Sequence, residues 1–429
     1  MIVRRILGPL LAIFLCPPVT ILIWYTNFAL DGSVLNLWMF FKEHGFFPSL
    51  SLIWSPVFWG SATAWTLIGC FAMSQLLLMR YVPGKQFEGP ITPHGNIPLY
   101  RANGPACFFI TLGTFCMLSF GLNCFPASLL YDHLGEIIGA LNLLSFSFCL
   151  FLYFKGRFFP SSSDAGSTGN FLFDFYWGTE LYPRIAGLDL KRFTNCRFGM
   201  MSWPLLLISY AAKQEELFGI THGMLIAVFL QLLYIGKFFL WETGYLRSLD
   251  IMHDRAGFYI CWGCMVFVPS LYTSATLYLV QHPVHLSNLT ALCLLAIGSS
   301  AILINYLADR QRQNFRASAG NCLIWGKRPL FTRAAYTTTQ GQIKENLLLC
   351  SGWWGISRHF HYLPEIIGAL CWSLPALFNH FLPYFYVVFL SVLLIDRAIR
   401  DDQRCSTKYK EVWKTHCQKV PYRILPYFW

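Results

Sequence analysis

Residues 6–29 read ILGPLLAIFLCPPVTILIWYTNFA, an apolar stretch without a charged residue. The hydrocarbon core of a bilayer needs about 20 apolar residues in helical form, so this stretch is long enough to cross it. Arg4 and Arg5 precede it, as basic residues precede the apolar region of a signal peptide. The run continues through Pro17 and Pro18 without a small-residue cleavage site at the right distance, and we therefore predict a first transmembrane helix.

Similar apolar runs recur along the chain. They lie near 57–79, 105–126, 134–154, 198–213, 221–241, 258–280 and 289–308, with a closing pair within 363–396. Backbone groups in lipid must be hydrogen-bonded within the protein, which leaves helices or a closed barrel. The runs are continuous rather than alternating, so we predict an all-α, polytopic transmembrane bundle of eight to ten spans.

The closing pair is separated by Asn379 and His380, which predicts a tight re-entrant hairpin. We divide the chain into N-terminal helices and loops, 1–220, and a catalytic membrane region, 221–429. The second part contains the candidate cofactor pocket, and we expect that pocket to face the cytoplasm.

The composition agrees with a membrane protein. Hydrophobic residues make up 55% of the chain and charged residues 12%, about half the charged share of soluble domains. The net charge of +11 comes from 32 basic and 21 acidic residues. Basic residues gather in cytoplasmic loops, so the 309–347 loop and the C-terminal tail are expected on that side. No basic stretch is interleaved with aromatics, and nucleic-acid binding is not expected.

No metal centre is expected from spacing. Most of the 15 cysteines lie in apolar runs, where a thiol behaves as a small hydrophobe. Cys261 and Cys264 form an isolated C-x-x-C. The histidine boxes of membrane di-iron oxygenases are missing, and His282 and His285 fall in a short loop.

A nucleotide site would have to be built from helices and loops. The chain has neither a G-x-G-x-x-G after a strand nor a Walker motif, which excludes a Rossmann domain and a P-loop. Arg312 and Arg316 are four residues apart and share one helix face. Two guanidinium groups on one face suit a pair of phosphates, while a solvated basic loop explains them equally simply.

Residues 348–362, LLCSGWWGISRHFHY, combine glycines, tryptophans and a basic aromatic cluster. Trp354 and Tyr362 offer flat faces for a base or a nicotinamide ring, and Arg358 offers charge for a phosphate. An aromatic belt at the membrane interface collects the same residue types, so both interpretations stay open.

Ionisable residues at the ends of spans are further candidates. Glu242 follows the run near 221–241, Asp254 precedes the run near 258–280, and Tyr272 follows Pro269 within that run. Ionisable groups inside membranes are costly and usually functional, but Glu242 and Asp254 also fit an interfacial role.

Two stretches carry a family resemblance. Residues 169–184 and 348–362 resemble the characteristic motifs of the membrane sterol reductases that act on C14, C24(28) or C7 double bonds. Tyr182 stands where most relatives have Asn, which resembles the Δ7 branch. Further stretches similar to that branch are 131–136, 160–166, 193–202, 253–264 and 420–426.

The resemblance implies NADPH as the cofactor and a sterol that enters from the bilayer lipid. It places the cofactor at Arg312, Arg316, Leu349, Trp354, His361, Tyr362, Asp401, Cys405, Ser406, Thr407, Lys408, Tyr409 and His416, with Arg358 and Arg404 as further phosphate candidates. It also implies a multi-pass protein of the endoplasmic reticulum in a eukaryote or of the inner membrane in a bacterium.

The implied chemistry is reduction of an unactivated double bond. A proton must first reach one carbon, because hydride alone does not add to an electron-rich alkene. We hypothesise that Tyr272, supported by Asp254 or Glu242, donates that proton, with no metal involved. The alternatives are a Δ14-sterol reductase and a non-catalytic sterol-binding membrane protein. The C-terminal part also resembles isoprenylcysteine methyltransferases, which use S-adenosylmethionine.

Overall fold

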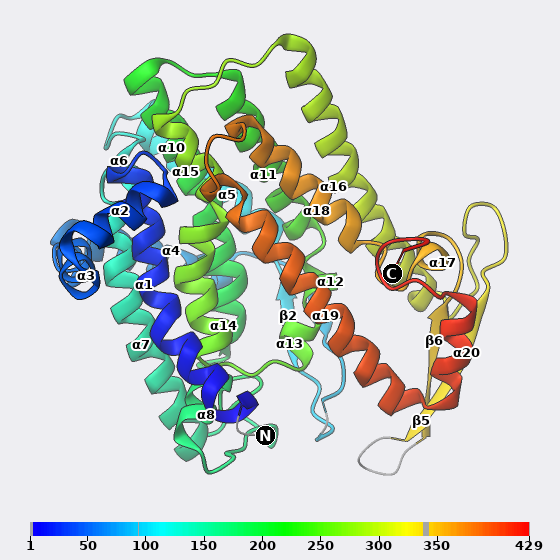
Figure 1. Cartoon of the computed structure of the whole chain (residues 1–429). Helices are drawn as coiled ribbons and strands as arrows, with labels where there is room; N and C mark the ends of the chain where they lie inside the picture. The colour runs from blue at the N-terminus through cyan, green and yellow to red at the C-terminus, as the bar shows by residue number, and fades with distance from the viewer. Residues whose placement is uncertain (1–2, 93, 338–342, 429) are drawn as a thin grey trace. The chain divides into compact units, whose positions relative to one another are not determined.

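The computed structural model describes residues 3–92, 94–337 and 343–428, and it forms two compact units (Figure 1). Unit 1 comprises Met1–Leu286 and Leu374–Phe385, and unit 2 comprises Ser287–Ser373 and Tyr386–Trp429. The division that we predict at residue 220 on functional grounds falls inside unit 1 and stays a prediction.

Unit 1 is built mainly of helices. In chain order its longer helices are α1 (Gly8–Ala29), α2 (Val34–His44), α3 (Phe46–Trp54), α4 (Ala62–Tyr81), α5 (Gly104–Cys116), α7 (Leu134–Phe158), α10 (Met200–Phe218), α11 (His222–Leu240) and α15 (Ser274–Gln281). The short ones are α6 (Leu129–Asp132), α8 (Phe171–Trp177), α9 (Leu190–Arg192), α12 (Glu242–Tyr245), α13 (Leu249–Met252), α14 (Phe258–Trp262), η5 (Leu374–Ala376) and η6 (Leu382–Tyr384).

Four π-helical segments interrupt or extend these helices: η1 (Val3–Leu7), η2 (Met117–Gly121), η3 (Phe193–Gly199) and η4 (Gly263–Tyr272). The segments η3 and η4 pack against each other, and Tyr272 ends the second. π-Helical turns are uncommon and often occur at functional sites, which draws attention to this pair.

Unit 2 combines long helices with a hairpin. Its elements are α16 (Asn288–Ala317), β5 (Phe331–Thr337), β6 (Ile343–Leu349), α17 (Trp353–Ile356), α18 (Tyr362–Ser373), α19 (Phe385–Tyr409) and α20 (Glu411–Lys419). β5 and β6 pair antiparallel, with Phe331 opposite Leu349. Unit 1 has two shorter antiparallel pairs, β1 (Lys85–Glu88) with β2 (Leu99–Ala102) and β3 (Arg184–Ile185) with β4 (Leu188–Asp189).

The prediction of a polytopic helical bundle is confirmed. Eight helical stretches of the described chain are long and apolar enough to span a membrane. They are Arg5–Ala29, Ala62–Tyr81, Gly104–Gly121, Leu134–Phe158, His222–Leu240, Phe258–Gln281, Asn288–Ala317 and Leu382–Tyr409. Phe14 and Leu15 in the first are 66% and 56% exposed, as lipid-facing side chains are.

Two predicted spans differ in the structure. The run at 198–213 is helical in η3 and α10, but α10 ends in Lys213, Glu215 and Glu216 and is not among the eight. The two helices of the closing pair differ in length, because α18 has only 12 residues. At 1.5 Å per residue it reaches about 18 Å, which is short of the roughly 30 Å hydrocarbon core.

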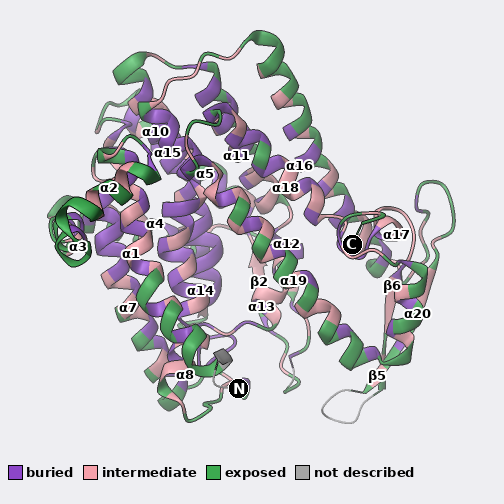
Figure 2. Cartoon of the chain, in the orientation of Figure 1, coloured by how far each residue is buried: buried purple, intermediate pink, exposed green. Residues whose placement is uncertain are grey.

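The stretch Phe258–Gln281 is the central helix of unit 1. Of its most apolar window 83% is buried inside the protein, against 22% for Ala62–Tyr81. Figure 2 shows the contrast between the buried α14 region and the exposed α2 and α3. Most side chains of this helix therefore pack against the protein interior, and Tyr272 is half-buried.

Candidate functional site

The C-terminal end of α16 and the tryptophan pair of α17 form one cluster in unit 2. The guanidinium carbon of Arg312 lies 3.8 Å from the centre of the Trp354 ring. The Trp354 indole Nε1 donates to the Ala308 carbonyl at 2.8 Å, which holds the ring against α16. Asp309 Oδ1 is 3.7 Å from Arg312. The structure thus places Arg312 and Trp354 together, as the two motifs suggest.

Gly352 explains why the tryptophan pair can lie so close to α16. Its φ is +64°, and a Cβ there would lie 2.3 Å from Oε1 of Gln311. That oxygen accepts a hydrogen bond of 2.9 Å from the Trp353 amide. A side chain at 352 would displace Gln311 and free the loop, so the glycine serves close approach within the protein.

Histidines and Tyr362 extend the aromatic face. His361 lies 4.9 Å from the Trp354 ring and 4.3 Å from Tyr362. His359 stacks on Tyr362 at 5.2 Å. Burial lowers the pKa of His359 to about 4, although Asp401 partly opposes this. His359 is therefore neutral at pH 7, and the face of the cluster carries no imidazolium charge from it.

Arg358 has a different environment from the other arginines. Its Nη1 donates to the carbonyls of Val420 and Pro421 at 2.7 and 2.8 Å, and its Nη2 lies 3.6 Å from Asp402. The side chain is buried. These bonds anchor the C-terminal tail, so the predicted phosphate contact of Arg358 would require it to use its remaining donors.

The predicted cofactor residues of the tail come from α19 and α20. Arg404 donates to Asp401 at 2.8 Å, and the Lys408 amine lies 3.7 Å above the Tyr336 ring. Tyr409 accepts a hydrogen bond of 2.7 Å from Asn346. The remaining positions of the predicted run are Cys405, which is buried, and Ser406 and Thr407, which are exposed.

Leu349 and His416 complete the predicted set. Leu349 is buried on β6 and packs with Phe315 and Trp354. His416 stacks on Trp413 at 5.1 Å, and its Nδ1 lies 3.3 Å from the Cys350 sulfur. Burial lowers the pKa of His416 to about 4. His416 is therefore a neutral packing residue at pH 7.

The cluster fits a ligand that carries phosphates. Arg316 and Lys408 have no carboxylate within ion-pair distance in the described part of the chain, and both are exposed. In the part of the chain that the structure describes, the carboxylates that pair with the neighbouring Arg312 and Arg404 are those of Asp309 and Asp401. This surplus of positive charge beside an aromatic face suits a dinucleotide.

The carboxylate of Glu242 belongs to a buried network in unit 1. Its Oε1 lies 2.7 Å from Arg197 and 3.1 Å from Arg192, and its Oε2 accepts from the Gly104 amide at 2.7 Å. Burial raises the Glu242 pKa, but the two guanidinium groups outweigh it and hold that pKa below its ordinary value. Glu242 is therefore ionised at neutral pH and is not itself a proton donor.

Asp254 and Tyr272 have other partners. Asp254 is 1% exposed, and its Oδ1 lies 3.1 Å from His253. Its carbonyl accepts a 2.8 Å bond from Lys191, whose pKa burial lowers to about 8. Tyr272 packs edge-on against Trp203, with ring centres 5.2 Å apart. The partners recorded for Glu242 and Asp254 do not include Tyr272, so support of Tyr272 by either carboxylate stays a prediction.

Sequence reasoning did not select several residues of these two networks. They are Asn103, Arg192 and Arg197 in unit 1, and Tyr336 and Asn346 in unit 2. Arg192 and Arg197 lie directly before the apolar run at 198–213, and charged residues so close to an apolar run are a signal of a paired partner in the interior.

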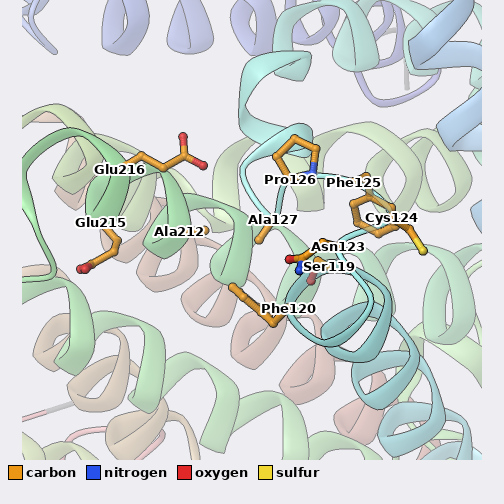
Figure 3. A pocket seen from close by; sticks show the side chains of 10 residues that line it. All are labelled: Ser119, Phe120, Asn123, Cys124, Phe125, Pro126, Ala127, Ala212, Glu215 and Glu216. Carbon is orange, nitrogen blue, oxygen red and sulfur yellow. The ribbon is translucent and has the colours of Figure 1, made fainter.

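A separate pocket of about 470 Å³ lies in unit 1 at the ends of η2 and α10. Figure 3 shows its lining, in which Phe120, Phe125 and Pro126 lie near Glu215 and Glu216. None of the predicted site residues lines it. Glu215 accepts from the Ile220 amide and Glu216 lies 3.4 Å from Lys213, so both carboxylates have local structural partners.

Comparison with protein families gives one match over nearly the whole chain. Residues 13–429 match the model of the "Ergosterol biosynthesis ERG4/ERG24 family". The match includes the Arg312–Trp354 cluster of unit 2 and the Glu242 network of unit 1.

Curated relatives cover most of the chain. A 7-dehydrocholesterol reductase of Arabidopsis thaliana is 54% identical over 414 residues, which is 96% of this chain and 94% of that protein. A 7-dehydrocholesterol reductase of Xenopus laevis is 39% identical, over 82% of this chain and 75% of its own. A Delta(14)-sterol reductase of Methylotuvimicrobium alcaliphilum is 36% identical, over 93% and 92% of the two chains.

Proposed function

The chain belongs to the ergosterol biosynthesis ERG4/ERG24 family, and on that premise we propose that it reduces the C7–C8 double bond of a sterol with NADPH. The observation that carries the proposal is the 54% identity to a 7-dehydrocholesterol reductase over 96% of the chain. The Delta(14)-sterol reductase is 36% identical at similar coverage, which favours C7 over C14.

The cluster in unit 2 is the proposed cofactor site. Arg312, Arg316, Arg404 and Lys408 bind the phosphates, because their positive charge exceeds that of the carboxylates beside them. Trp354 and Tyr362 present aromatic faces to the planar rings. The proposed set also keeps Leu349, His361, Asp401, Tyr409 and His416, which shape and orient this cluster.

NADPH, when bound, supplies a hydride to one carbon of the sterol double bond. Tyr272 donates the proton to the other carbon through its hydroxyl group, and a positioned donor of this kind typically contributes a factor of about 100 to 10,000. Glu242, being ionised and paired with Arg192 and Arg197, is a positioning residue in this proposal. Asp254 precedes the helical stretch that contains Tyr272. Its carbonyl accepts from Lys191 and its carboxylate lies beside His253, so it is proposed to position this end of the stretch.

The sterol is proposed to come from the bilayer. It is an apolar molecule, and the helices of this protein expose large apolar side chains such as Phe14 to the lipid. The endoplasmic reticulum is the proposed location in a eukaryotic cell, with the C-terminal basic tail on the cytoplasmic side.

The decisive experiment uses the full chain in detergent. Adding 7-dehydrocholesterol and NADPH should give cofactor oxidation at the rate at which the C7-reduced sterol accumulates by gas chromatography. A sterol with a C14–C15 double bond, tested in parallel, should react much more slowly. Faster reduction of the C14 substrate would reassign the activity to C14, and sterol binding without turnover would make the protein a sterol-binding module.

A further inference from the structure

Three side chains with metal-binding atoms converge in unit 1, although they are far apart in the sequence. The ligand atoms of Asp31, His282 and His380 all lie within 4.8 Å of one another. Asp31 follows the end of α1, His282 follows the end of α15, and His380 lies between η5 and η6. Each position is just outside a predicted span or in a turn, so water and ions can reach it.

The hydrogen bonds of His282 define what its second nitrogen needs. Nδ1 of His282 lies 2.9 Å from the Tyr278 carbonyl, which can only accept, so Nδ1 carries a hydrogen. Nε2 lies 2.9 Å from Oδ1 of Asp31. In the neutral ring, Nε2 then carries no hydrogen, and its lone pair faces a carboxylate oxygen. Two acceptors at this distance need a cation between or beside them, either a proton or a metal ion.

This arrangement is typical of metal-binding histidines. Such a histidine usually donates its other ring N–H to a carbonyl or carboxylate, which fixes the ring and the tautomer. The Tyr278 carbonyl provides that partner for His282. The donor set is therefore two imidazole rings and one carboxylate, with one ring already oriented.

Tyr278 also holds the three segments in place. Its ring stacks on His282 at 3.9 Å with an interplanar angle of 3°, and it meets His380 edge-on at 5.8 Å. Gly32, next to Asp31, has φ +67°, and a Cβ there would lie 2.5 Å from the Tyr278 ring. Only glycine lets the chain after α1 pass this ring closely enough to bring Asp31 to His282.

We propose that Asp31, His282 and His380 bind a first-row transition-metal ion, with Zn²⁺ as the foremost candidate. Imidazole nitrogens suit zinc, copper, iron and nickel, whereas calcium and magnesium take mainly oxygen ligands. The Asp31 side chain is 72% exposed, so water completes the coordination. Three protein ligands and one water give the four ligands that zinc usually takes.

The ion would act as a structural clamp. His380 lies in Leu374–Phe385, the segment that packs with unit 1 although its flanks on both sides belong to unit 2. Asp31 and His282 follow the ends of two helices of unit 1, α1 and α15. Binding of one ion to all three would therefore fasten the returning segment to the ends of α1 and α15, and it would do so independently of the proposed reductase activity.

The test measures Zn²⁺ binding by the full chain in detergent, after chelator treatment, against a chromophoric competitor. Wild type should bind one more equivalent than His380→Ala, or bind the ion at least about tenfold more tightly. His285→Ala is the matched control, because His285 lies exposed in the loop that carries His282, and it should bind like wild type. Co²⁺ in the same site should give weak visible bands without thiolate absorption, which separates it from the 15 cysteines.

Asp31→Asn guards against a folding defect, because its exposed side chain can change without disturbing the core. Zn²⁺ should raise the Tm of wild type and His285→Ala but not that of His380→Ala or Asp31→Asn. Equal binding and equal Tm shifts in all four proteins would overturn the proposal and leave an Asp31–His282 pair that holds a proton only.

Discussion

Nη2 of Arg197 donates a hydrogen bond of 2.7 Å to Oε1 of Glu242, and both side chains are almost completely buried. The same oxygen also faces Arg192 at 3.1 Å. A buried charge pair contributes little over an apolar pair, but removing one partner leaves the other charge uncompensated. Loss of the Glu242 carboxylate is therefore expected to destabilise the folded protein, whatever its effect on the reaction.

We expect Glu242→Gln to lower the free energy of unfolding by about 3–5 kcal/mol, because Arg197 and Arg192 would keep their buried charge without a carboxylate. Thermal unfolding in detergent measures this. The control is Glu88→Gln, on the exposed face of β1, which should change the stability little. Similar Tm values for the two variants would contradict the structural importance of the pair.

The pH dependence of stability should carry the signature of the same carboxylate. Glu242 has a pKa below its ordinary value of 4.5 in the folded protein. Its stabilising contribution is then present above about pH 4.5 and is lost as the pH falls through the lower, folded pKa. The Tm of wild type should therefore fall more steeply below pH 4.5 than that of Glu242→Gln. Parallel curves would rule out this source of acid sensitivity.

Arg316→Ala should weaken NADPH binding at least about tenfold, since a hydrogen bond to a charged group is worth about 1.5–3 kcal/mol. Its exposed guanidinium has no competing carboxylate in the described part of the chain. Arg310→Ala is the control, because Arg310 lies on the same helix but contacts Tyr306. Equilibrium titration with NADPH gives both constants, and equal affinities would remove Arg316 from the cofactor site.

Tyr272→Phe should lower turnover by a factor of about 100 to 10,000 while NADPH still binds. Tyr234→Phe is the matched control, because both tyrosines pack on Trp203, with ring-centre distances of 5.2 and 5.8 Å. The control should keep its turnover. Unchanged turnover in Tyr272→Phe with intact folding would mean that another group donates the proton.

His359 should make unit 2 sensitive to mild acid. Burial lowers its pKa from 6.5 to about 4, so the unfolded chain binds more protons between these values. The contribution of neutral His359 to the free energy of unfolding is therefore fully present above pH 6.5. It decreases as the pH falls from 6.5 to 4, by up to about 3 kcal/mol. His359→Gln should flatten this part of the Tm curve, whereas the exposed His285→Gln should not. A curve unchanged by His359→Gln would refute the assignment.

Hydropathy predicted the membrane architecture because the bilayer imposes one requirement on every span, a continuous apolar run. Seven of the predicted runs therefore appear as spanning helices, as with 134–154 and Leu134–Phe158. The closing hairpin was less accessible to this reasoning. Its first half, α18, ends after 12 residues, since Pro375 and the turn that follows interrupt the helix.

The motifs predicted the cofactor cluster where its residues are close in the chain, as in 348–362, or share one helix face, as Arg312 and Arg316 do. The cation–π contact of Arg312 with Trp354 joins two such motifs. The bonds that fix Arg358 to the tail at Val420 were not predictable, because they depend on how the chain returns after α20.

The sequence alone determined that this chain spans a membrane many times and that its C-terminal part carries basic and aromatic residues suited to a phosphorylated ligand. The length of an apolar run and the spacing of residues on one helix depend on neighbouring residues only, so both can be recognised before the fold is known. Only the tertiary structure decided that Glu242 is paired with Arg197 and that Asp31, His282 and His380 meet. Such contacts depend on packing between segments far apart in the chain, and no local pattern records which segments will pack.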